Sequence, residues 1–389
     1  MLSKNIKFKN FLNKSKSFSV NRSFKILKND YLKKKLKLLL SLSHSYKYSY
    51  SKKIVYKYKN FQNFKVIGIG GSILGSKAIY QFLSHKIKKN FFFVDNLQTT
   101  LDLHKKKKIV NLIISKSGNT LETISNSNIL INSKKNIFIV ENKNNYLNIL
   151  ANQLKADIVE HKNYIGGRYS VLSEVGMLPA ELMGLNEKKF KRLNYLINNK
   201  QFIKNLVENV ASTLSLVNSK KYLSVILNYD HKSENLFSWY QQLIAESLGK
   251  KSKGIIPLVS AMPKDNHSLM QLYLDGPKNS FYTFFSVLEK NSSKINSKYL
   301  LKSHYYLRNK KLSNIIRSQM RATQNVFKRK KIPFRSFEIL ERNEESLGEI
   351  FCFFILETIL LGRALKVNPF DQPSVELIKK ETKKILLSN

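Results

Sequence analysis

Apolar residues along this chain follow two different spacings. Short, continuous apolar runs predict strands, and the segments between them carry apolar residues every three to four positions, as helices do. In the first half, the runs lie at 65–69, 91–94, 109–114, 136–140 and 157–159. Strands that are apolar throughout and alternate with helices are typical of a parallel sheet covered on both faces.

A second series of the same kind follows. Its runs lie at 222–227, 254–259, 281–287 and 333–340, and helices are expected at 73–83, at 234–248, in a long basic segment ending near 330, at 346–365 and at 374–387. The first 60 residues predict lysine-rich helices instead. We therefore expect an α/β protein with a helical segment at 1–60, a parallel-sheet domain at 61–200 and a second one, ending in helices, at 201–389.

Composition narrows the class of protein. With 389 residues, 42% of them hydrophobic, the chain can bury two cores. The single cysteine, Cys352, excludes an intrachain disulfide and favours the cytosol, and no apolar run is long enough to span a bilayer. The net charge of +42 raises nucleic acid as a partner, but lysines are abundant everywhere, so a drift in composition explains the charge better than a dedicated site.

Two segments rich in glycine or hydroxyls follow predicted strands. Residues 66–75 read VIGIGGSILG, and residues 115–123 read SKSGNTLET. The first lacks the third glycine of a dinucleotide fingerprint and the Gly-Lys-Ser/Thr of a nucleotide loop. Each segment could hold an anion against the N-terminus of a helix. A sharp turn explains the first equally well, and helix capping by Ser117 or Thr120 is the alternative for the second.

A third pair of segments combines a cation with a carboxylate. Residues 166–170 read GGRYS and residues 241–247 read QQLIAES. Arg168 keeps its charge at any working pH, and Glu246 shares a helix face with Gln242 four residues earlier. The alternative is a surface arginine and a solvated glutamate.

The fourth pair joins DNHS at 265–268 to NPFDQPSVE at 368–376, with Lys379 beyond. His267 could serve only as a polar contact, and Lys379 could be one more solvated lysine. No Cys/His spacing suits a metal, so neither a metal nor a cofactor is expected.

Taken together and in this order, the four constellations resemble the phosphoglucose isomerase family. The resemblance runs from Gly68 to about Lys379 and is most specific around 166–171 and 368–373. It implies two sugar-isomerase domains of flavodoxin-like α/β type, and a homodimer with active sites at the subunit interface. It also implies interconversion of glucose 6-phosphate and fructose 6-phosphate through a cis-enediol(ate).

The resemblance assigns roles to single residues. Glu246 matches the base that moves a proton between C2 and C1, and Arg168 matches the cation that stabilises the cis-enediol(ate). His267, expected from the neighbouring subunit, and Lys379 match the pair that opens the sugar ring, and Glu122 matches a glutamate that orients the histidine. The residues matched to the phosphate and the rest of the substrate are Ser72, Ser115, Lys116, Ser117, Thr120, Gly167, Gln242 and Gln372.

Three other functions remain open at this point. A non-catalytic sugar-phosphate regulator would keep Ser115, Ser117 and Thr120 but would not need the four catalytic candidates together. An isomerase that also accepts mannose 6-phosphate would share most of the same groups. A nucleic-acid binder would show steeply salt-dependent binding.

Overall fold

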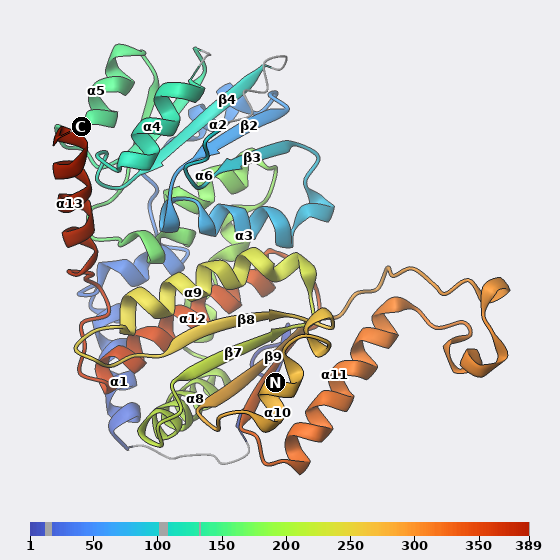
Figure 1. The fold of residues 1–389 in the computed structure, drawn as a ribbon. Helices are drawn as coiled ribbons and strands as arrows, with labels where there is room; N and C mark the ends of the chain where they lie inside the picture. Colours follow the sequence, from blue (N-terminus) through green and yellow to red (C-terminus); the bar gives the residue numbers. More distant parts are fainter. Residues whose placement is uncertain (12–17, 101–107, 132–133, 389) are drawn as a thin grey trace.

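Two five-stranded sheets lie at opposite ends of the molecule, with helices stacked between them (Figure 1). The computed structural model describes residues 1–11, 18–100, 108–131 and 134–388. The central helices are α3 (Leu74–Phe82), α9 (Glu234–Leu248) and α12 (Glu344–Ala364), and α9 contacts both of the others. The expected α/β class with parallel sheets is confirmed.

The first sheet is parallel throughout, in the order β3-β2-β4-β5-β6. Its central strands β4 and β5 are buried at every position, which explains why they appear in the sequence as continuous apolar runs. The predicted strands of this half are confirmed, with bounds of Asn63–Ile67 (β2), Asn90–Val94 (β3), Ile109–Ser115 (β4), Asn136–Val140 (β5) and Asp157–Glu160 (β6).

The second sheet has the order β1-β10-β9-β7-β8 and includes one strand that the sequence did not predict. The predicted members are Leu223–Asn228 (β7), Ile256–Ala261 (β8), Ser280–Val287 (β9) and Phe334–Ile339 (β10), all parallel. β1 (Ile6–Lys9) pairs antiparallel with β10, Ile6 lying opposite Ile339. The prediction of helices throughout residues 1–60 was therefore wrong for this segment, which alternates buried and exposed residues along an edge of the sheet.

α12 lies in the core of the molecule and is apolar on nearly all sides. All of its residues from Ser346 to Gly362 are buried. One of its deeply buried charges, Glu357, forms an ion pair with Arg335 of β10, and both side chains are only 1% exposed. Asn209 of α8 (Lys200–Asn218) donates to the same carboxylate at 2.6 Å, so α8, α12 and β10 are joined by one polar cluster.

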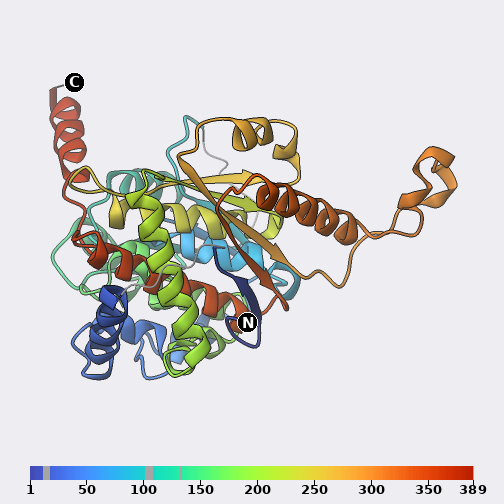
Figure 2. The same ribbon diagram turned by 90° about the horizontal axis from the view of Figure 1, so that it is seen from below.

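Two segments project from this body (Figure 2). Residues 288–311, called the arm below, connect β9 to α11 (Leu312–Arg329) and expose Tyr299, Leu301 and Tyr306. α13 (Val375–Ser388) has no buried residue among its described positions. The other α-helices are Phe18–Leu32 (α1), Lys52–Tyr58 (α2), Leu121–Leu130 (α4), Tyr146–Gln153 (α5), Glu174–Leu182 (α6), Leu193–Leu196 (α7) and Met270–Asp275 (α10). Within the described ranges, no helix is both long and apolar enough to cross a bilayer.

Candidate active site

Two glycine-rich loops meet at the end of the first sheet, next to α9. One follows β2, and the other carries the short 3-10 helix η4 (Gly167–Leu172). A Cβ atom on Gly71 would lie 2.1 Å from the carbonyl carbon of Gly167, so the two backbones touch. Ser170 of the second loop donates a hydrogen bond to the Gly71 carbonyl at 3.3 Å. The first and third constellations of the sequence are thus in direct contact, and glycine is what allows it.

Gln242 and Glu246 lie on the α9 face that adjoins these loops. Gln242 Nε2 donates to Glu246 Oε1 at 2.8 Å, across one helical turn. The same amide nitrogen would lie 2.7 Å from a Cβ atom on Gly70, whose φ of +55° also favours glycine. Gln242 Oε1 is buried and has no hydrogen-bond partner within the described chain. An acceptor without a donor therefore lies beside the carboxylate.

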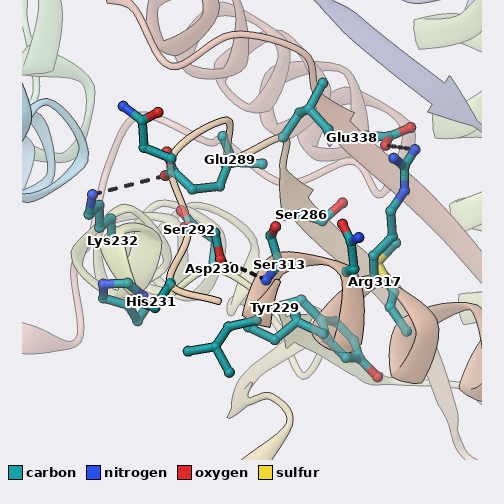
Figure 3. A pocket seen from close by; sticks show the side chains of 18 residues that line it. Tyr229, Asp230, His231, Lys232, Ser286, Glu289, Ser292, Ser313, Arg317 and Glu338 are labelled. Atoms are coloured by element: carbon teal, nitrogen blue, oxygen red, sulfur yellow. Dashed lines mark hydrogen bonds and ion pairs between the residues drawn. The ribbon is translucent and has the colours of Figure 1, made fainter. Parts of the chain in front are cut away.

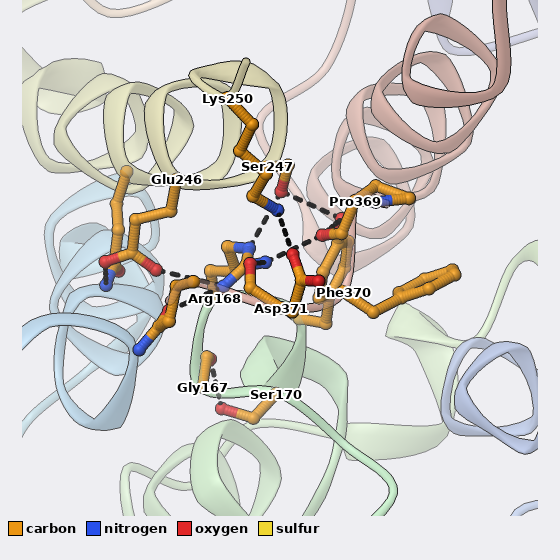
Figure 4. A network of polar contacts seen from close by, with 12 residues as sticks. Gly167, Arg168, Ser170, Glu246, Ser247, Lys250, Pro369, Phe370 and Asp371 are labelled. Carbon is orange, nitrogen blue, oxygen red and sulfur yellow. Dashed lines mark hydrogen bonds and ion pairs between the residues drawn. The ribbon is translucent and has the colours of Figure 1, made fainter. Parts of the chain in front are cut away.

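Arg168 is the centre of the site (Figure 4). Its side chain is 2% exposed, and Nη1 donates to Glu246 Oε2 at 3.1 Å and to Gln372 Oε1 at 2.7 Å. Nη2 donates to the carbonyls of Pro369 and Asp371 at 2.7 and 2.9 Å. Nε donates to Ser247 Oγ at 2.8 Å, so all five N–H groups of the guanidinium are used.

Several residues that the sequence analysis did not select support this arginine. The Tyr169 hydroxyl donates to the Pro369 carbonyl and lies 2.9 Å from Ser247 Oγ. Burial raises the pKa of Tyr169, which keeps its hydroxyl protonated. Trp239 of α9 donates to the Arg168 carbonyl at 3.0 Å. Ser247 and Tyr169 directly follow Glu246 and Arg168 in the chain, and that adjacency was the only sequence signal for them.

A second ion pair fixes the segment after α12. Lys250 Nζ lies 2.7 Å from Asp371 Oδ1 and also donates to the Asn368 carbonyl. The hydrogen bond and charge of Lys250 lower the pKa of Asp371. Residues 368–372 are therefore attached to the end of α9 by Lys250 and to η4 by Arg168.

Three hydroxyls gather where β4 ends and α4 begins. Ser115 Oγ and Ser117 Oγ lie 2.9 and 3.5 Å from Thr120 Oγ1. Thr120 is the N-cap residue of α4, but its side chain makes no capping hydrogen bond. The backbone N–H groups of Leu121 and Glu122 have no hydrogen-bond acceptor within the described chain. Hydroxyls beside free N–H groups at a helix N-terminus suit an anion, so the geometry fits this interpretation better than simple capping.

Lys116 lies between these hydroxyls in sequence but its ammonium group has other partners. Its Nζ donates to the Asn163 carbonyl at 2.7 Å and lies 3.6 Å from Glu141 Oε1. Burial lowers the pKa of Lys116. Its expected contact with the substrate phosphate therefore requires the side chain to turn away from both partners.

The single chain does not bring the remaining candidates to Arg168. His267 is exposed after β8, and in the described chain its imidazole makes no hydrogen bond with Glu122 or with any other residue. Lys379 on α13 pairs with Glu376 at 2.6 Å, and both side chains are 57% exposed. Ser72 ends the short 3-10 helix that follows β2 (Gly70–Ser72), and Glu122 lies in the first turn of α4, which follows β4.

Comparison with known sequences identifies relatives along most of the chain. The family model described as phosphoglucose isomerase matches residues 42–389. A protein named glucose-6-phosphate isomerase from Methanocaldococcus jannaschii is 33% identical over 356 residues, which cover 83% of this chain and 85% of the relative. One of the same name from Mycoplasmopsis synoviae is 33% identical over 349 residues, covering 81% and 80%.

Solved structures show the same fold. A hypothetical protein from Thermus thermophilus superposes with a TM-score of 0.80 at 23% identity, covering 95% of this chain and 96% of that one. A glucose-6-phosphate isomerase from Chlamydia trachomatis gives a TM-score of 0.71 at 18% identity, covering 90% and 73%. At these identities the likeness concerns the fold alone.

Proposed function

The chain belongs to the phosphoglucose isomerase family, and we propose that it interconverts glucose 6-phosphate and fructose 6-phosphate at the Arg168–Glu246 site. One observation carries this assignment to the site. A carboxylate, fixed on both oxygens by Gln242 and by a buried arginine, lies beside the glycine loop after β2, and the neighbouring strand β4 ends at a cluster of hydroxyls and a helix N-terminus. The relatives described above are named as isomerases, so they give the regulator alternative no support.

Glu246 acts as the base. It takes the C2 proton of the open-chain aldose, which leaves a cis-enediolate, and returns the proton to C1, while the hydroxyl proton moves from O2 to O1. Negative charge grows on these oxygens as the C2 proton leaves. The permanently charged guanidinium of Arg168 stabilises that charge. Gln372, an exposed side chain, is the Nη1 partner that a substrate oxygen displaces.

The phosphate binds at the N-terminus of α4. The hydroxyls of Ser115, Ser117 and Thr120 and the free N–H groups there suit a dianion. Binding a group remote from the reacting carbons holds those carbons against the base, so the phosphate contributes to turnover through positioning. Gln242 Oε1, which has no donor in the described chain, accepts a hydrogen bond from a sugar hydroxyl.

Ring opening requires an acid and a base at the ring oxygen and the anomeric hydroxyl, and we assign these roles to Lys379 and His267. His267 comes from a second copy of the chain in a homodimer. Its exposure supports this, as does α13, whose apolar Leu377 and Ile378 are exposed. The proposal includes a cytosolic location, since the sole cysteine, Cys352, is a free buried thiol.

Conversion of fructose 6-phosphate, with a dehydrogenase reporting glucose 6-phosphate, tests the reaction. Glu246→Gln should lower kcat by roughly 10²–10⁴-fold, because an amide cannot accept the proton, while substrate binding is retained. Glu234→Gln, the same change at the start of α9, is the control and should leave kcat unchanged. Full activity in Glu246→Gln would remove this residue from the role of base. Failure of the folded wild-type protein to convert the substrate would refute the assignment of the reaction.

A further inference from the structure

The four parallel strands of the second sheet, β7 to β10, follow the same order as β2 to β5 of the first. In the first, β2 lies between β3 and β4, and in the second, β7 lies between β8 and β9. In each sheet, therefore, the chain passes from this strand first to the neighbour on one side and then to the neighbour on the other side. Ligands of open parallel sheets bind where the order reverses in this way, at the carboxyl ends of the strands. In the first sheet that point carries the glycine loop after β2 and the hydroxyls after β4.

A cavity of about 400 Å³ occupies the equivalent point of the second sheet. Its walls come from Tyr229–Lys232 after β7, from the end of β9 and the start of the arm, and from the first turns of α11. Its volume lies within the range of small-molecule sites. Nothing in the proposed isomerase reaction uses it.

Charged groups at both ends of the cavity are already paired (Figure 3). Lys232 Nζ lies 4.0 Å from Glu289 Oε2, and Arg317 Nη2 lies 2.6 Å from Glu338 Oε1. The third acid of the lining, Asp230, accepts two hydrogen bonds from Arg342, at 2.7 and 3.1 Å. A phosphate would have to take a cation from its carboxylate, whereas a neutral ligand leaves every pair intact.

The backbone N–H groups at the start of α11 already have hydrogen-bond acceptors in the chain, whereas those of Leu121 and Glu122 at the start of α4 do not. The Leu312 N–H donates to the Ser293 carbonyl at 2.9 Å, and the Ser313 N–H donates to Ser292 Oγ at 2.9 Å. The N–H group of Asn314 donates to the Lys311 carbonyl. The chain itself therefore satisfies the donors that bind an anion at the start of α4.

The rest of the lining combines hydroxyls with an apolar wall. Ser286, Ser313 and Asn291 supply donors and acceptors, and Ile316 and Met320 of α11 supply apolar surface. A sugar or sugar alcohol has this combination of many hydroxyls and a C–H face. We propose that the cavity is a second ligand site, equivalent by topology to the first, which binds a neutral polyhydroxylated molecule such as an unphosphorylated hexose or hexitol.

Saturation-transfer NMR on the full chain tests the site, with D-glucose and D-glucitol as probes. Glucitol 6-phosphate, which has no carbonyl group and cannot isomerise, is added to occupy the phosphate site. We expect both neutral probes to bind with dissociation constants of about millimolar order, as suits ligands of this size. Inorganic phosphate should not displace them.

Two matched variants locate the binding. Ser313→Trp places an indole against the cavity and should weaken glucitol binding by at least about 10-fold, a loss of about 1.4 kcal/mol. Ser318→Trp lies on the same helix outside the lining and should change it less than about twofold. Both variants should keep isomerase activity, which separates this test from that of the reaction. Absence of glucitol binding, equal binding by the two variants, or displacement by phosphate would each overturn the proposal.

Discussion

Lys191 is a buried cation that pairs with no carboxylate of the described residues, and we expect this to make the stability of the protein depend on pH near neutrality. Its Nζ donates to the Ser41 carbonyl at 2.5 Å and also to that of Leu172, the last residue of η4. The rings of Tyr46 and Tyr48 lie 4.9 and 4.8 Å away. Across the described residues, no acid lies within ion-pair distance of this ammonium group.

Burial lowers the pKa of Lys191 to about 7, against the weaker opposite influence of Glu174, Cys352 and Glu187. Its ordinary pKa is 10.5, so between about pH 7 and that value the unfolded chain binds a proton that the folded chain has released. The free energy of unfolding then rises with pH by about 1.4 kcal/mol per unit. Below pH 7 both states are protonated, and this dependence disappears. Between pH 6.5 and 8.5, Lys191 should contribute a gain of about 2 kcal/mol.

Urea unfolding at pH 6.5, 7.5 and 8.5 measures this gain. The wild-type protein should gain about 2 kcal/mol more than Lys191→Met over this range, because methionine fills the site but does not titrate. Lys189→Met, an exposed neighbour, should behave like the wild-type protein. If Lys191→Met and the wild-type protein gain the same stability, the ammonium group does not titrate near pH 7 and the reasoning is wrong.

Two further substitutions test the geometry of the site. Arg168→Lys leaves three N–H donors for the five acceptors that the guanidinium now contacts. In the coupled assay, kcat/KM should therefore fall by roughly 10²–10³-fold. A variant whose kcat/KM stays within twofold of the wild-type value would contradict the role given to the guanidinium. Gly71→Ala would place its methyl group 2.1 Å from the Gly167 carbonyl carbon, so it should cost about 1–3 kcal/mol of stability and most of the activity. Gly166→Ala, where the nearest atom would be 3.5 Å away, is the control and should melt near the wild-type temperature.

The fold could be predicted where burial leaves a clear pattern. β4 and β5 are covered on both faces, so only apolar side chains suit most of their positions, and their predicted bounds agree with the observed ones to within one residue. β1 gave no such signal. It is four residues long, lies at an edge, alternates with lysine, and pairs with β10, more than 300 residues away in the chain. A local pattern does not encode a partner so distant.

The sequence allowed the residue types of the site to be predicted, but not the hydrogen bonds and backbone contacts that join them. The spacing of Gln242 and Glu246 places them on one helix face, as observed. The acceptors that fix Arg168 include backbone carbonyls of residues 368–372, and a carbonyl carries no sequence signal. The Gly71–Gly167 contact joins two loops that are separated in the chain by strands β3 to β6. Such contacts appear only once the tertiary structure is known.

The position of Arg168 explains how two sheets could serve one reaction. The hydroxyls proposed to bind phosphate follow β4 of the first sheet, whereas the proposed base lies on α9, which follows β7 of the second. Arg168 lies on a loop next to the first sheet and donates hydrogen bonds to Glu246. It also donates to the carbonyls of Pro369 and Asp371, in the segment before α13. A shift between the two sheets would therefore stretch the Arg168–Glu246 contact. In the proposed reaction this saturated guanidinium therefore helps to fix the base relative to the phosphate site, which is the positioning that proton transfer at a carbon atom requires.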